Sequence, residues 1–130
     1  MPQKTQNVAT FIHPSGFIEQ HYLGTQTGET VADGVRQVSE LVDQFHSEGK
    51  SALVLVSLDD VESTNLDSHA EAVKGMKEVP CDRLSIYGSL RMQVLLNTLI
   101  LVADKTDIGR AFGSRIDALR WLREGKEREQ

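Results

Sequence analysis

The feature of this sequence that most restricts its fold is the segment at residues 52–68. An apolar run at residues 52–58 ends at two aspartates, and a polar stretch then leads to a helix start near Ser68. A short continuous apolar run is typical of a strand covered on both faces. A strand, a loop and a helix in succession form the repeating unit of an α/β sheet. Binding sites in such sheets form where carboxyl ends of strands meet the following helices, so this segment also marks a candidate site.

Hydrophobic periodicity predicts the elements on either side of this segment. Before it, strands at residues 8–12 and 17–23 flank a His-Pro-Ser-Gly turn, and a helix begins with Thr30 and Asp33 as a capping pair. After it come a helix, a strand at residues 84–87, a helix from Ser89 to about residue 103, a strand at residues 108–112 and a final helix. The order predicts an α/β fold: a single mixed sheet with an N-terminal hairpin, followed by β-α repeats, and four helices.

Length and charge restrict the class of protein. At 130 residues the chain has the size of one domain, with an expected core at about residues 8–124, a polar N-terminus and a charged tail from Gly125. The net charge of -5 argues against non-specific nucleic-acid binding. Cys81 is the single cysteine, and residues 1–7 lack the apolar core of a signal peptide, so we expect a cytoplasmic protein.

The order of elements and the wording of several segments resemble the STAS superfamily of anti-sigma-factor antagonists. The resemblance is closest to its STAS-like branch, which is linked to Sec14-type lipid-binding domains. The segments that carry it are Gly-Thr-Gln-Thr at residues 24–27, Ala-Leu-Val-Leu-Val-Ser-Leu-Asp at 52–59, Arg-Leu-Ser-Ile-Tyr-Gly at 83–88, Gly-Arg-Ala-Phe at 109–112 and Ala-Leu-Arg-Trp-Leu at 118–122. The resemblance implies a STAS-like domain that acts by binding and not by catalysis.

In the antagonists, an Asp-Ser pair at the start of the helix after the central strand includes a phosphorylated serine. The matching pair here is Asp67 and Ser68, so the resemblance implies Ser68 as a candidate phosphosite. A phosphate near a helix N-terminus meets free N–H groups and a favourable dipole. The alternative is that both residues simply cap the first turn. Together with Asp59 and Asp60, they form the candidate binding loop.

We expect no catalytic residue, metal or cofactor. Asp59 and Asp60 are adjacent and diverge at a strand end, so they converge poorly on one ion, and an enzyme that uses them or His69 is the weakest hypothesis. Cys81 has no base beside it in the sequence and is expected to be a small, partly buried thiol. The four histidines have no ligand spacing; they are His13, His21, His46 and His69.

The helix after Ser89 carries a further candidate surface. One apolar stripe is expected to face the sheet, and Leu90, Val94 and Leu101 fall on a second, nearly opposite stripe. A neighbouring helix, a second copy of the chain, a ligand groove or a membrane surface would each explain the second stripe. A groove would add three residues of the preceding helix, namely Leu66, Val73 and Met76.

Two functional hypotheses follow. The first is a non-catalytic STAS-like binding module that is regulatory through a protein partner or an amphiphile. The second is a carrier of a hydrophobic ligand or lipid, with peripheral membrane association as a variant. A homodimer through the second stripe is compatible with either hypothesis.

Overall fold

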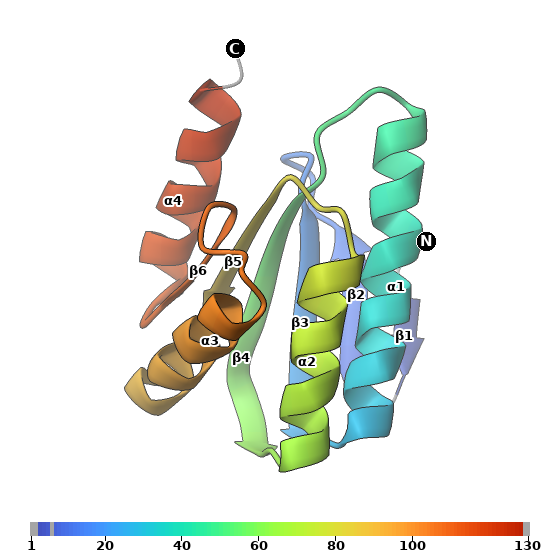
Figure 1. The fold of residues 1–130 in the computed structure, drawn as a ribbon. Coiled ribbons are helices and arrows are strands. Elements are labelled where there is room, and N and C mark those ends of the chain that lie inside the picture. Colours follow the sequence, from blue (N-terminus) through green and yellow to red (C-terminus); the bar gives the residue numbers. More distant parts are fainter. Residues whose placement is uncertain (1–2, 6, 129–130) are drawn as a thin grey trace.

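The computed structural model describes residues 3–5 and 7–128, and its elements alternate as expected after an N-terminal hairpin (Figure 1). The strands are β1 (Gln3–Thr5), β2 (Val8–Ile12), β3 (Ile18–Thr25), β4 (Leu53–Ser63), β5 (Arg83–Tyr87) and β6 (Gly109–Phe112). The helices are α1 (Gly28–Ser47), α2 (Leu66–Glu78), α3 (Leu90–Val102) and α4 (Arg115–Arg128).

The strands form one mixed sheet in the order β1-β2-β3-β4-β5-β6. The β1–β2 and β2–β3 pairs are antiparallel, and the β3–β4, β4–β5 and β5–β6 pairs are parallel. The expected fold class is therefore confirmed. Strand β1 was not expected, because residues 3–5 are polar and carry no alternating apolar pattern. The charged tail expected from Gly125 instead continues α4 to Arg128, and residues 129–130 lie outside the described residues.

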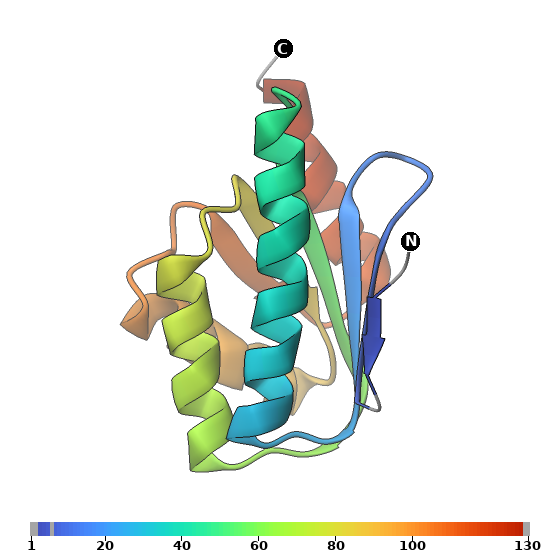
Figure 2. The same cartoon turned by 90° about the vertical axis from the view of Figure 1, so that its right-hand side faces the viewer.

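The helices cover the sheet unequally. Helices α1, α2 and α3 lie on one face, and α4 covers the strands β4, β5 and β6 on the other (Figures 1 and 2). Successive side chains of a strand point to opposite faces. Accordingly, Val54 and Val56 of β4 join the core under α1 and α3, whereas Leu53 and Leu55 join the core under α4.

Strand β4 is longer than its apolar run. It extends through Asp59 and Asp60 to Ser63, because β3 continues beside it with Leu23 opposite Asp60 and Thr25 opposite Ser63. The prediction that a loop begins at Asp59 is therefore wrong. Backbone pairing with β3 extends the strand although four of its five residues beyond Leu58 are exposed; Val61 is half-buried and packs against the core.

Two helix predictions are corrected. Helix α1 begins earlier than expected, because Thr27 is its N-cap and Thr30 is the third helical residue of a capping box. The helical spacing of apolar residues in the last helix predicts Ile116 in the core and Ala118 at its edge, but in α4 Ile116 is exposed and Ala118 is fully buried. The small side chain of Ala118 lets α4 approach β5, where Ser85 Oγ donates a hydrogen bond to the Ala118 carbonyl.

The outer edge of β6 is covered by a side chain. Asn97 of α3 donates from Nδ2 to the Ala111 carbonyl (3.2 Å) and accepts at Oδ1 from the Ala111 N–H (2.9 Å). The side-chain amide therefore pairs with both backbone groups of Ala111, in the manner of a neighbouring strand.

Candidate ligand-binding cavity

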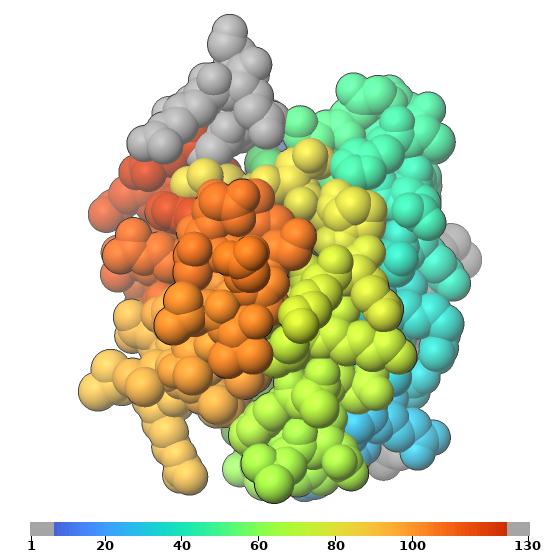
Figure 3. Space-filling view, in the orientation of Figure 1, coloured from blue at the N-terminus to red at the C-terminus, as the bar shows by residue number. Residues whose placement is uncertain are grey.

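Helix α2 lies against α1 and α3 on the three-helix side of the sheet (Figure 3). Its contact with α1 is close at Gly75, where an added Cβ would lie 2.5 Å from Val35 Cγ2. Because Gly75 has no side chain, the Val35 side chain of α1 packs directly against the backbone of α2. The small residues on the inner side of α2 leave space between this helix and the sheet.

That space is a partly open cavity of about 130 Å³. A single water needs only roughly 10–15 Å³ on the same measure. The wall is almost entirely apolar and is built from all three helices and the sheet. Its apolar residues include Val31, Val35 and Val38 of α1, Ala72 and Met76 of α2, Met92, Leu95, Leu96 and Leu99 of α3, and Val54, Val56, Leu58, Leu84 and Ile86 of the sheet.

A few polar side chains lie in the wall, and most of them bond to one another or to backbone. Thr64 Oγ1 and His69 Nε2 are 2.8 Å apart. Gln26 donates to the Leu23 carbonyl and accepts from the Thr30 hydroxyl. No Asp, Glu, Lys or Arg lies among the described residues of the wall.

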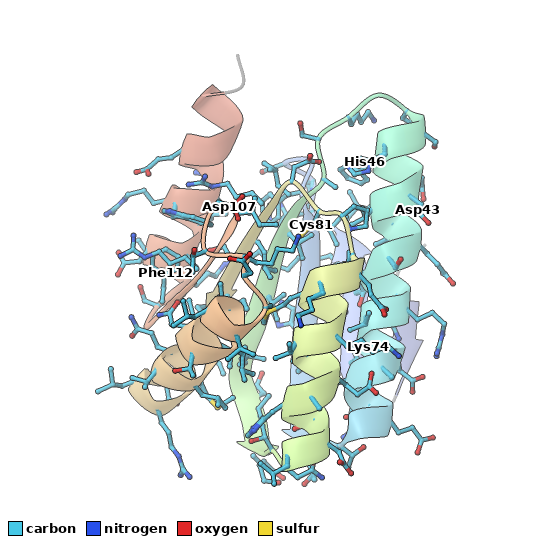
Figure 4. All side chains as sticks on the ribbon, viewed as in Figure 1. Asp43, His46, Lys74, Cys81, Asp107 and Phe112 are labelled. Atoms are coloured by element: carbon cyan, nitrogen blue, oxygen red, sulfur yellow. The ribbon has the colours of Figure 1, made fainter. Side chains whose placement is uncertain are left out.

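Cys81 lies in the wall between the end of α2 and β5 (Figure 4). Burial, with a further contribution from the neighbouring Asp82 carboxylate, raises the pKa of its thiol to about 11. The thiol is therefore protonated at neutral pH, when a nucleophilic cysteine would be a thiolate. The expectation of a small, partly buried thiol is confirmed.

The four residues of the candidate binding loop lie on two elements. Asp59 and Asp60 are exposed on β4, and Asp67 is exposed in the first turn of α2. Ser68 is only 2% exposed, and it forms the capping box with Asn65. Its hydroxyl donates to the Asn65 carbonyl (2.6 Å) and accepts from the Asn65 N–H (3.0 Å).

The predicted hydrophobic groove is not the cavity that the structure contains. Of its six residues only Met76 lies in the wall; Val73 is half-buried outside it, and Leu66 is exposed at the start of α2. Leu90, Val94 and Leu101 are 74%, 60% and 67% exposed, so no helix of the described chain covers them. Their role as an interface stays a prediction.

Sequence reasoning missed most of the cavity. Leu95 and Leu99 belong to the apolar stripe of α3 that was expected to face the sheet, and the strand pattern places Tyr22 opposite to Glu19 without indicating a cavity; all three residues line it. The available signal was Gly75 within the α2 pattern, because an internal glycine in a helix often marks a close approach.

A second polar cluster lies on the opposite face of the sheet. Glu19 of β3 accepts two hydrogen bonds from the Arg115 guanidinium, at 2.9 and 3.1 Å, and its Oε2 lies 2.6 Å from His21 Nε2. Burial alone would raise the pKa of Glu19, but the hydrogen bonds and charges of Arg115 and His21 outweigh burial and lower it. Acidic residues interleave with the basic residues near the C-terminus, a pattern that predicts a solvated, ion-paired helix face, yet Arg115 joins α4 to β3.

Within residues 3–5 and 7–128, no three His, Cys, Asp or Glu side chains are grouped so that they could hold a metal ion. No helix in this described part is long and apolar enough to span a membrane.

No protein-family model matches the sequence. A search of curated proteins likewise finds no match. Among solved structures, the chain is similar to an uncharacterized protein from the DUF3478 family with a SpoIIAA-like fold, from Shewanella loihica PV-4. The TM-score is 0.62 at 18% identity, over 94% of this chain and 98% of that one. The chain has a SpoIIAA-like fold. The STAS resemblance is therefore confirmed for the fold, and at this identity it carries no activity, ligand or partner to this chain.

Proposed function

We propose that this SpoIIAA-like chain is a non-catalytic binding module that holds a small apolar or amphiphilic ligand in the cavity beneath α2. The observation that carries the proposal is a cavity of about 130 Å³ whose described wall is apolar and holds no charged side chain. Binding sites for small molecules are concave and mostly apolar, with a few polar groups.

The size of the cavity supports a ligand. Protein interiors pack as densely as organic crystals, and spaces larger than a water molecule are few. Apolar space of this kind holds water poorly, because a buried water needs two to four polar partners. An apolar ligand would replace the missing van der Waals contacts of the wall and would remove its own surface from water.

The chemistry of the wall supports binding over catalysis. Cys81 is the strongest potential nucleophile of the wall, and its raised pKa keeps the thiol protonated. Ser68 is engaged with the Asn65 backbone, and His69 with Thr64. Nucleophilic catalysis needs a nucleophile within hydrogen-bond reach of a base, and these side chains are paired in other ways.

Two substitutions on α2 test the proposal. Ala72 lies in the cavity wall, and Ala70 is exposed two residues earlier on the same helix. Ala72→Leu should fill part of the cavity and reduce ligand binding, whereas Ala70→Leu should leave binding unchanged. Native mass spectrometry of gently purified protein would detect a co-purifying ligand, and added toluene serves as a defined apolar probe whose binding is measured directly.

The outcome is decided by the comparison of the two variants. A ligand or probe that binds wild type and Ala70→Leu but is lost from Ala72→Leu supports the proposal. Absence of any co-purifying ligand together with no toluene binding, or equal binding by both variants, would contradict it.

A second candidate role is recognition of a protein by the outer face of α3. Three large apolar side chains that lie one helical turn or two apart are exposed there: Leu90, Val94 and Leu101. Exposed apolar patches often mark interaction sites. A second copy of the chain and a peripheral membrane surface remain alternative occupants.

Regulation through Ser68 also remains a proposal. A phosphate on Ser68 would remove the hydroxyl proton donated to the Asn65 carbonyl, and it would place its charge in the cavity wall. Phosphorylation would therefore rearrange the first turn of α2. Phosphopeptide mapping of protein from its native cell tests this, and lack of modification across growth conditions would end it.

A further inference from the structure

The hydroxyl of Tyr22 is the unusual polar group of the cavity. Tyr22 lies in the wall and is 9% exposed, yet its hydroxyl has no hydrogen bond with any described residue. The other hydroxyl and amide side chains of the described wall each have at least one such bond. Among the described side chains, no fully buried oxygen or nitrogen lacks a partner, so the Tyr22 hydroxyl keeps contact with open space.

Gly34 of α1 fixes the position of this hydroxyl. A Cβ added at Gly34 would lie 2.3 Å from Tyr22 Oη, so the phenol rests directly against the α1 backbone. The Gly34 carbonyl accepts a hydrogen bond from Gln20 Nε2 at 2.8 Å instead of from Tyr22. The glycine therefore makes room for a hydroxyl that the protein itself leaves unused.

The charge of the wall limits what such a hydroxyl can bind. No Lys or Arg lies among the described wall residues to balance a buried anion, and no Asp or Glu lies there to balance a cation. Burying an unpaired charge is costly, whereas a neutral polar group needs only a hydrogen-bond partner. Burial raises the pKa of Tyr22 far above neutrality, so the phenol keeps its proton and can both donate and accept.

We infer that the cavity selects a neutral amphiphile, with an apolar body and one hydroxyl or carbonyl group that hydrogen-bonds to Tyr22 Oη. This inference rests on the proposed function, because it assigns a ligand class to the same cavity. The cavity would bind alcohols and ketones more tightly than carboxylates and phosphates that carry the same apolar body.

Three soluble probes of similar shape test the inference: toluene, benzyl alcohol and sodium benzoate. Their affinities are measured at pH 7.5 by calorimetry or by ligand-observed NMR, with wild type and Tyr22→Phe. Tyr87→Phe is the matched control, because Tyr87 is a buried tyrosine on the α4 side of the sheet, where its hydroxyl accepts from Arg115. Melting temperatures verify that both variants fold.

The expected result has two parts. Tyr22→Phe should lower the affinity for benzyl alcohol by about 2- to 12-fold, which corresponds to one net hydrogen bond, and should leave the affinity for toluene unchanged. Tyr87→Phe should change neither affinity. Benzoate should bind wild type at least about tenfold more weakly than benzyl alcohol.

Three results would overturn the inference. If Tyr22→Phe lowers the affinities for toluene and benzyl alcohol equally, the substitution acts through packing. If its affinity for benzyl alcohol is unchanged, the ligand does not use the hydroxyl. Benzoate that binds as tightly as benzyl alcohol would refute the selection of neutral ligands. If toluene binds to wild type but one of these three results is obtained, the inference is overturned and the proposed function stands. If none of the three probes binds to wild type, both the inference and the proposed function are overturned.

Discussion

Glu19→Gln should destabilise the protein in a pH-dependent manner. Glu19 is 4% exposed, and it accepts two hydrogen bonds from Arg115 and lies 2.6 Å from His21 Nε2. Glutamine keeps the shape but loses the charge, and its amide N–H group faces the Arg115 donors. Breaking a buried ion pair costs about 3–5 kcal/mol, and we discount this to about 2 kcal/mol because the Arg115 side chain is 37% exposed.

The direction of the pH effect follows from the lowered pKa of Glu19. A carboxylate with a lower pKa in the folded state contributes stability above its unfolded pKa of about 4.3. That contribution is lost as the pH falls through the folded-state pKa. Glutamine does not titrate, so the difference between wild type and Glu19→Gln should be largest near neutral pH and should shrink below about pH 4.

Urea unfolding at pH 7.5 and at pH 3.5 measures both effects. At neutral pH, a loss of about 2 kcal/mol corresponds to a melting temperature about 7 °C lower for a chain of this length. Arg120→Met is the control, because the Arg120–Asp117 pair is exposed and 3.8 Å apart, and its loss should cost at most about 1 kcal/mol. A Glu19→Gln loss that is the same at both pH values would refute the electrostatic explanation.

Three further predictions concern the three-helix side of the molecule. Gly75→Ala should lower the free energy of unfolding by about 1–3 kcal/mol, because the new Cβ would lie 2.5 Å from Val35 Cγ2; a more stable variant in urea unfolding would contradict this packing. Val94→Glu should change the free energy of unfolding by at most about 0.5 kcal/mol, because Val94 is exposed, and should dissociate a dimer in sedimentation. A wild-type monomer would end the dimer hypothesis. Cys81, with a pKa of about 11, should react with iodoacetamide at pH 8 at least about tenfold more slowly than in the urea-unfolded chain; equal rates by mass spectrometry would show an accessible thiol.

The order of the later elements could be predicted from the sequence because the spacing of apolar residues along a helix or strand is a local property. Alternation along residues 17–23 predicts Glu19 and Tyr22 on opposite faces of that strand, and this is confirmed, because Glu19 points to α4 and Tyr22 points to α1. Continuous apolar residues placed β4, and Ser89 correctly marked the start of α3. Each of these patterns is complete within a few residues.

The cavity was missed because it depends on small residues and on distant packing. The apolar stripe predicted on α2 comprises Leu66, Ala70, Val73 and Met76, of which only Met76 lines the cavity, whereas the buried positions of the helix are Ser68 and Gly75. Counting apolar side chains favours large residues, but close contact with α1 selects a glycine. The extension of β4 likewise depends on pairing with β3, which no pattern within β4 records.

The pair of hydrogen bonds from Asn97 to Ala111 has a consequence for association between molecules. An uncovered edge strand is a template on which another chain can add a strand, and such addition can continue into a polymer. At β6 the backbone N–H and carbonyl of Ala111 are already hydrogen-bonded to the side-chain amide of Asn97 on α3. A strand of another molecule would have to displace Asn97 before it could pair with β6 at Ala111. This one side chain therefore opposes polymerisation at this edge of the sheet.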